Sequence, residues 1–339
     1  MFFKIMNQEE NHGDCDVLVD DEFNDEFNDD INQSCRTNGI YFTDAAGVFN
    51  FLCDGIYLRE VLVPIDHPDF KMIKDKSNNK WRANMIILGN CYDLSNVETF
   101  KYLIECGANI HSYNNAALRF SAEFGYLDVV KYLIESGAEI HADNDYALRS
   151  SAEFGHLSVV EYLVECGSDI HADNDAALCV SAEFGHLPVV KYLVRNDADI
   201  HIDNDCALCL SAEFGHLSVV EYLINNGADN DFALIISAYG GHLSVVKYLV
   251  ENGSDIHTEN DAALQVSAEF GHLDVVKYLI ESGANICADN DLALRLSAEN
   301  NHLDVVEYLV ENGANIHTDI FLFLVRVLKI EMTKNNTIY

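Results

Sequence analysis

The sequence repeats one phrase of about 30 residues over most of its length, and this periodicity limits the possible folds more than any other feature. The phrase can be read from Asn144 to Asp173 as N-D-Y-A-L-R-S-S-A-E-F-G-H-L-S-V-V-E-Y-L-V-E-C-G-S-D-I-H-A-D. An Ala-Leu pair marks each copy, and the pairs begin at Ala117, Ala147, Ala177, Ala207, Ala233, Ala263 and Ala293. Successive pairs lie 30 residues apart, except for a step of 26 residues after Ala207. A fixed period in this range predicts a solenoid of stacked units.

Each unit has the pattern of two amphipathic helices. In one copy, small and apolar residues recur at helical spacing from Ala147 to Ala152, and Gly155-His156 then interrupts the pattern. The second half carries a broad apolar stripe at Leu157, Val159, Val160, Leu163 and Val164. Gly167 follows the last turn, where a left-handed residue commonly ends a helix. Two helices with a short link cannot bury both faces alone, so antiparallel helix pairs are predicted to stack.

This unit resembles the ankyrin repeat. The run S-A-E-F-G-H-L-x-V-V-x-Y-L-V-E-x-G-x-D-I stands where the family has A-A-x-x-G-H-x-x-V-V-x-x-L-L-x-x-G-A-D-V. The resemblance covers roughly residues 85–319, about eight units. It implies a mostly α, ankyrin-repeat solenoid of antiparallel helix pairs with short hairpin links.

Two departures from the family pattern have structural consequences. The family's Thr-Pro-Leu-His opening is replaced by x-Ala-Leu-x, so Asp145, Asp175 and Asp205 are predicted to cap the first helices instead. The period is also about three residues short of the usual 33, and the missing residues fall in the hairpin. We therefore expect short hairpins between successive repeats, and a contact surface shifted from these hairpins toward the first helices.

The chain is predicted to divide into four regions. Residues 1–35 form an acidic, poorly ordered lead-in, with an acidic docking tail for a basic partner as the alternative. Residues 36–84 do not fit the repeat and predict a small α+β module. Residues 85–319 form the array, in which 85–113 is a degenerate cap and 204–229 a short unit, and residues 320–339 form a terminal capping helix or half-repeat. The short module contains G-I-Y-L-R-E-V and K-W-R-A-N-M-I-I-L-G. Together with this module, the array resembles the large ankyrin-repeat families of giant DNA viruses, which implies a viral protein but no particular activity.

Charge and cysteine usage limit the partners and the compartment. The formal net charge is −36, and such a surface repels phosphate backbones and anionic lipid, so we expect neither nucleic-acid nor membrane binding. The ten cysteines form no paired framework, and the N-terminus has no secretory signal. Both observations predict a reducing compartment, the cytoplasm, which would be the host's if the protein is viral. The longest apolar run, Ile320 to Ile330, is too short to span a bilayer.

No residue pattern indicates catalysis, a metal or a cofactor. Twelve of the 14 histidines occupy two fixed positions of the repeat, which favours local hydrogen bonding over metal binding. The C-x-x-C of Cys206 and Cys209 occurs in one unit only, so it indicates neither redox nor zinc chemistry. The recurring Asp-Asn-Asp triplets favour a turn and a cap, with an acidic ladder for cations or a basic partner as the alternative.

Two groups of residues are candidates for binding. A phenylalanine precedes the turn glycine in five units, at Phe124, Phe154, Phe184, Phe214 and Phe270. Exposed, these rings would form an apolar binding strip; packed on their neighbours, they would seal the stack. The variable first-helix positions add Tyr146, Arg149, Phe232, Gln265 and Arg295. The second group is a basic hairpin (Lys74, Lys76, Lys80, Trp81 and Arg82), interpreted either as a phosphate- or base-stacking site or as a solvated loop.

Together these observations predict a monomeric, non-enzymatic scaffold that binds an unidentified protein, such as a host protein, through the concave face of the array. Two alternatives remain open: a ligand-binding or enzymatic module at residues 36–84 that the repeats target, and a structural virion component. The four-residue slip near residue 228 predicts a hinge in the stack.

Overall fold

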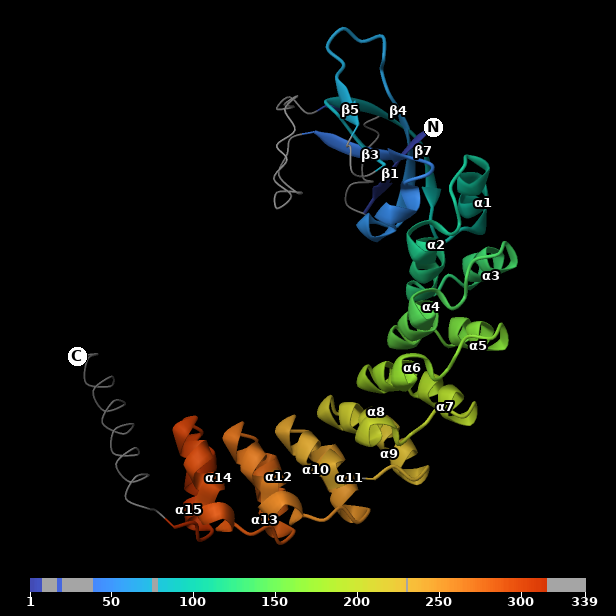
Figure 1. Ribbon diagram of the computed structural model, residues 1–339. Coiled ribbons are helices and arrows are strands. Elements are labelled where there is room, and N and C mark those ends of the chain that lie inside the picture. The colour runs from blue at the N-terminus through green and yellow to red at the C-terminus, as the bar shows by residue number, and fades with distance from the viewer. Residues whose placement is uncertain (8–16, 20–38, 75–78, 230, 316–339) are drawn as a thin grey trace, which may run out of the picture. The chain divides into compact units, whose positions relative to one another are not determined.

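The computed structural model describes residues 1–7, 17–19, 39–74, 79–229 and 231–315 (Figure 1). The chain divides into two compact units, Met1–Asp169 and Ile170–Tyr339. The first unit holds a β-sheet followed by helix pairs, and the described part of the second holds helices. The predicted fold class, a mostly α ankyrin-repeat solenoid after a small strand-containing module, is confirmed.

The module is a seven-stranded antiparallel sheet with the strand order β2-β7-β4-β1-β3-β6-β5. The strands are β1 (Phe2–Met6), β2 (Val17–Val19), β3 (Ile40–Asp44), β4 (Tyr57–Leu62), β5 (Met72–Lys74), β6 (Lys80–Ala83) and β7 (Met85–Asp93). A 3-10 helix, η1 (Val48–Asp54), lies between β3 and β4 in the chain. One face of the sheet buries a core formed by Met6, Phe42, Val61, Ala83, Ile86 and Leu88.

The sheet corrects two predicted boundaries. Residues 2–6 are not part of a poorly ordered lead-in, because β1 pairs with β4 on one side and β3 on the other and buries Phe3 and Ile5. Residues 85–93 are not the first half of a degenerate repeat, because they form β7, which pairs with β4. The buried Ile86 and Leu88 alternate with less buried neighbours along this strand. The rest of the lead-in, apart from β2, and the predicted terminal helix at 320–339 lie outside the described residues.

The repeats begin at α1 and alternate a longer first helix with a second helix of nine residues. The helices are α1 (Val97–Glu105), α2 (Ser112–Glu123), α3 (Leu127–Glu135), α4 (Ala142–Glu153), α5 (Leu157–Glu165), α6 (Ala172–Glu183), α7 (Leu187–Arg195), α8 (Ile202–Glu213), α9 (Leu217–Asn225), α10 (Asp231–Tyr239), α11 (Leu243–Glu251), α12 (Thr258–Glu269), α13 (Leu273–Glu281), α14 (Ala288–Glu299) and α15 (Leu303–Glu311). First helices pack on first helices, as α6 does on α8, and second helices on second helices, as α7 does on α9. The Val-Val-x-x-Leu stripe explains this packing, since Val159, Val160 and Leu163 are fully buried.

The short unit keeps its packing face. Its first helix, α10, has nine residues where α8 and α12 have twelve, because the slip removes the link and the start of the helix. The helix still packs against α8, α11 and α12, and Leu234 and Ala238 are fully buried. The helix packing is therefore continuous through the slip, and a hinge at this point stays a prediction.

Six of the described first helices begin with three consecutive residues in the left-handed region. In α4 these are Asp143 (φ 59, ψ 47), Asn144 (φ 53, ψ 56) and Asp145 (φ 54, ψ 38). The same conformation recurs in α2, α6, α8, α12 and α14. This conformation costs most L-residues roughly 1–2 kcal/mol each, and Asn and Asp tolerate it best. The Asp-Asn-Asp triplets therefore form a left-handed turn that leads into each helix.

Candidate partner-binding site

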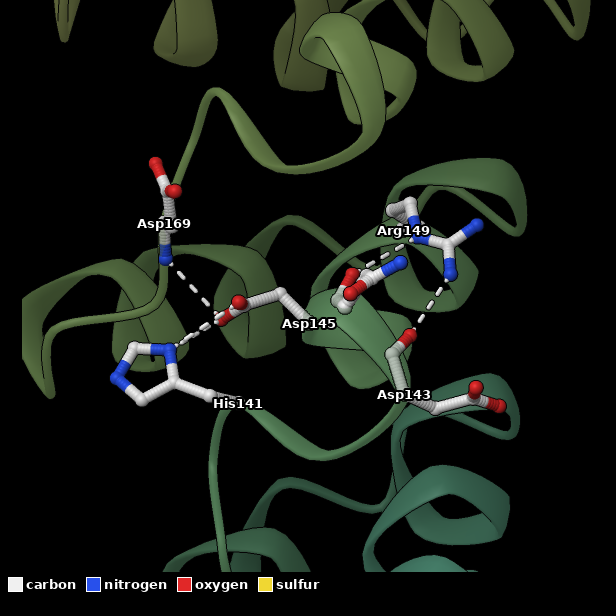
Figure 2. Close-up of polar contacts among 6 residues, drawn as sticks. His141, Asp143, Asp145, Arg149 and Asp169 are labelled. Atoms are coloured by element: carbon white, nitrogen blue, oxygen red, sulfur yellow. Dashed lines mark hydrogen bonds and ion pairs between the residues drawn. The ribbon is translucent and has the colours of Figure 1, made fainter.

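The third residue of each triplet links successive repeats. Figure 2 shows the buried Asp145 carboxylate accepting the backbone N–H of Asp169 at 3.0 Å and the His141 Nδ1–H at 3.1 Å. The acceptor recurs at Asn115, Asp175, Asp205, Asp231, Asp261 and Asp291, each bound to a backbone N–H 24 residues further on. The predicted helix-cap role of Asp145, Asp175 and Asp205 is wrong, since none of these side chains caps its own helix. The left-handed turn directs them toward the next link.

The turn histidines also join successive repeats. His156 Nε2 donates to the backbone carbonyl of Glu123 at 2.9 Å, and His216 Nε2 donates to that of Glu183 at 2.8 Å. The equivalent bonds of His242 and His272 measure 2.7 and 2.8 Å. These rings therefore have a structural role, as the local hydrogen-bonding interpretation predicts. Among the residues that the structure describes, no group of three or more His, Cys, Asp or Glu side chains could hold a metal ion.

The phenylalanine row is exposed to solvent. Phe124, Phe154, Phe184, Phe214 and Phe270 keep 40, 50, 50, 49 and 44% of their surface accessible. Each ring follows the last residue of a first helix and precedes the turn glycine. Phe184 stacks on His186 at 6.5 Å, and Phe270 meets Tyr239 edge-on at 4.6 Å, so neither contact joins two members of the row. The rings are thus about half exposed, and both interpretations of the row, a binding strip or a seal between neighbouring repeats, stay predictions.

A carboxylate stands beside every ring of the row. Each phenylalanine follows a glutamate in the sequence, as in Glu123-Phe124 and Glu183-Phe184. Burial raises the pKa of Glu123, and the negative charge of Glu153 raises it further. The ends of the first helices thus combine exposed aromatic rings with negative charge.

Several variable first-helix residues support the left-handed turn. Arg149 Nε donates to the carbonyl of Asn144 at 3.1 Å, and Arg149 Nη2 donates to that of Asp143 at 2.9 Å (Figure 2). Gln265 and Arg295 occupy the same position and bond turn carbonyls at 2.7 and 3.4 Å. Polar atoms of these three predicted contact residues are therefore engaged within their own repeats. Phe232 is different, because 58% of its surface is exposed.

The structure separates the members of the predicted basic hairpin. Lys74 Nζ lies 5.0 Å from the Trp81 ring centroid, whereas Lys80 Nζ lies 4.1 Å from that of Tyr41. Arg82 is 2% exposed and cannot present its guanidinium to a nucleic acid. Lys76 lies outside the described residues. Lys74 and Trp81 thus lie close together, Lys80 contacts a different ring and Arg82 is buried, and a role for this hairpin stays a prediction.

Sequence reasoning missed a cavity of about 270 Å³ within the first unit. Phe49, Leu52 and Cys53 of η1 line the cavity together with Phe120 and Glu123 of α2, Phe124 just after that helix, and Tyr146 of α4. The one available signal was Phe120, because the equivalent residues of the next repeats are Ser150, Val180 and Leu210. The η1 residues come from a distant part of the chain, so no local pattern indicates the cavity.

Comparison with known families agrees with this architecture. The family described as "Ankyrin repeats (3 copies)" matches residues 60–144, 148–233 and 234–320. These matches cover most of the chain, so the chain belongs to the ankyrin-repeat family. No helix of the described ranges has the length and apolar character needed to cross a membrane.

The curated relatives of this chain include proteins of a giant virus, Acanthamoeba polyphaga mimivirus. The chain is 40% identical to its ankyrin repeat protein R868 over 134 residues, which are 38% of this chain and 64% of that protein. It is 47% identical to the ankyrin repeat protein R229 over 97 residues, 27% of this chain and 32% of that one. The chain thus spans only part of these relatives' length.

A solved structure shows the same fold. The ankyrin repeat domain of human ASB11 aligns with a TM-score of 0.54 and 21% identity, over 59% of this chain and 99% of that domain. At this level of identity the similarity establishes the fold alone.

Proposed function

We propose that the chain is an interaction scaffold that binds a protein partner through the phenylalanine row. The observation that carries this proposal is the recurrence of a 40–50% exposed phenylalanine at one position of five repeats. Large exposed apolar side chains that recur in register mark interaction surfaces, and aromatic rings contribute much of the binding energy in interfaces. Ankyrin repeats as a family indicate protein–protein interaction, which agrees with this role.

The charge of the surface favours a basic partner. Each exposed ring adjoins a glutamate, and the whole chain carries a formal net charge of −36. A partner segment that alternates cationic and apolar side chains would match both the rings and the carboxylates. In this proposal the protein acts as a monomer without catalysis or a cofactor. The mimivirus relatives support a viral origin. In this proposal the protein acts on a host protein in the host cytoplasm.

Affinity capture from host lysate tests the proposal. The bait is the full chain, the test variant combines Phe184→Ala with Phe214→Ala, and the matched control is Ile65→Ala. Ile65 is 69% exposed and lies in the sheet module, outside the row. The wild type and the control should enrich the same proteins, and the double variant should lose them about tenfold or more, with an unchanged melting temperature.

Two results would refute the proposal. If the double variant retains every captured protein, the row does not bind them. If binding falls together with the melting temperature, the rings act through packing instead.

A further inference from the structure

The phenylalanine row reaches a cavity in the first unit, where Phe124 is one of the lining residues. Phe120 of α2 and Phe124, which follows that helix, pack with ring centroids 4.6 Å apart and form one aromatic wall. Phe49 of η1, Tyr113 and Tyr146 add further aromatic side chains to the lining. The η1 helix packs on α2, so the lining residues belong to one compact unit.

Glu123 is the one carboxylate that lines this cavity. Its backbone carbonyl accepts the His156 Nε2–H, but within the described part of the chain its side chain has no hydrogen bond or ion pair. Burial and the nearby Glu153 raise its pKa, and Arg119 only partly offsets this, so the ionised carboxylate is incompletely compensated by positive charge.

The cation that lines the cavity is only partly engaged, because within the described residues its buried Nε–H has no hydrogen-bond partner. Arg119 Nη2 donates to the carbonyl of Tyr113 at 3.0 Å, Nη1 lies 3.4 Å from the Asp143 carboxylate, and the guanidinium lies 5.1 Å from the Tyr146 ring centroid. Its charge lowers the pKa of Glu123 by less than burial and Glu153 raise it. The Glu123 side of the cavity is therefore suited to a cation, whereas the Nε–H of Arg119 would suit an acceptor group.

We propose that this cavity receives an arginine side chain of a basic partner segment, with the guanidinium paired to Glu123 and stacked on the phenylalanine rings. A volume of about 270 Å³ is below that of a drug-sized site and suits one or two side chains. Arginine fits better than lysine, because its planar group stacks on aromatic faces and pairs bidentately with carboxylates. The inference rests on the proposed function, since it makes the cavity the anchor for the segment that the row binds.

Ligand-observed NMR with capped tripeptides tests the inference on the full chain. The probe is Ac-Gly-Arg-Gly-NH2, and its control replaces arginine with citrulline, which has nearly the same shape without the charge. At about 0.15 M salt, where long-range attraction to the acidic surface is screened, the arginine peptide should bind at least about fivefold more tightly.

The repeat supplies matched protein variants. Glu123→Gln should weaken binding of the arginine peptide about tenfold, whereas Glu183→Gln should change it less than about twofold. Glu183 holds the same position in a repeat that does not contribute to the cavity. Phe120→Val should weaken binding severalfold without a change of charge, and it introduces the residue found at the equivalent Val180.

Three outcomes would overturn the inference: no detectable binding, equal binding of the arginine and citrulline peptides, or equal effects of the two glutamine variants. Tighter binding of Ac-Gly-Glu-Gly-NH2 would also overturn it, by assigning the cavity to an anion through Arg119. If the tripeptides fail while protein capture still depends on Phe184 and Phe214, this inference alone is wrong. If the arginine tripeptide binds as expected while protein capture is unchanged by the Phe184→Ala and Phe214→Ala substitutions, the proposed function alone is wrong.

Discussion

Replacing Asp175 with alanine should destabilise the second unit by about 2 kcal/mol. The Asp175 carboxylate is 3% exposed and accepts the Asp199 N–H at 3.0 Å. Loss of this bond costs about 1 kcal/mol, because the N–H is only partly buried. Asp175 is also left-handed (φ 49, ψ 33), a conformation that costs alanine about 1 kcal/mol more.

Asp175→Asn is the informative control. Asparagine keeps an acceptor oxygen and tolerates the left-handed region, as Asn115 shows by accepting the Glu139 N–H at 3.0 Å with φ 54. The lost ion pair with His171 matters little, because the imidazole is 57% exposed. We therefore expect Asp175→Asn to lie within about 0.5 kcal/mol of the wild type.

Native-state hydrogen exchange suits this test, because repeat arrays need not unfold in a single step. In Asp175→Ala, amides around Asp199 should exchange about 30-fold faster, the equivalent of about 2 kcal/mol. Urea unfolding of the full chain checks the overall loss. If asparagine destabilises as much as alanine, the charge and His171 carry the effect. If Asp175→Ala lowers the free energy of unfolding by less than about 0.5 kcal/mol, the hydrogen bond is a consequence of the helix packing and does not stabilise the fold.

Three further predictions test local chemistry. Gly185→Ala should lower the melting temperature more than Gly227→Ala. Both glycines have a positive φ (+73° and +103°), so alanine is strained at either position. A Cβ at residue 185 would also lie 2.5 Å from the turn histidine of the next repeat, whereas a Cβ at residue 227 would have no atom within 4 Å. Folding raises the pKa of Glu123, so its proton stabilises the folded chain at low pH and this contribution is lost as the pH rises through the raised pKa. Glu123→Gln should thus raise the melting temperature at pH 7 relative to wild type more than at pH 4, and equal shifts at both pH values would contradict this. Iodoacetamide at pH 8 should label Cys206 before Cys209, as mass spectrometry of the peptides would show, because a neighbouring thiol lowers the pKa of Cys206 while burial raises that of Cys209 to about 11.

The helix pairs could be predicted from the sequence because their determinants are local. Val159, Val160 and Leu163 fall on one face at helical spacing, and the structure buries all three. The sheet is harder to predict, because most of its strands pair with partners far away in the chain. In β1, the buried residues Phe3 and Ile5 alternate with a more exposed residue between them, as expected for a strand. The position of β1 in the sheet, however, depends on its pairing with residues 57–61.

The candidate site was predictable only in part for the same reason. The position of the phenylalanine row follows from the repeat, but its exposure does not, since a ring before a turn can pack or face solvent. The role of Asp145 was mistaken because an aspartate before a helix usually caps it, whereas here its partner is the N–H of Asp169. The cavity is lined by both Phe49 and Phe120. These residues are far apart in the chain, and no local sequence pattern predicts that η1 packs on α2.

The uniformity of the repeat creates a problem for recognition that the first unit resolves in our proposal. Equivalent rings such as Phe184 and Phe214 offer a partner segment nearly the same contact in successive repeats, so a segment displaced by one repeat would bind almost as well. Such a row adds affinity with each ring but does not fix the register. The cavity has no copy along the row, since η1, which contributes to its lining, occurs once in the described chain. An arginine held by Glu123 would therefore set the register, and the rings that follow would add the affinity.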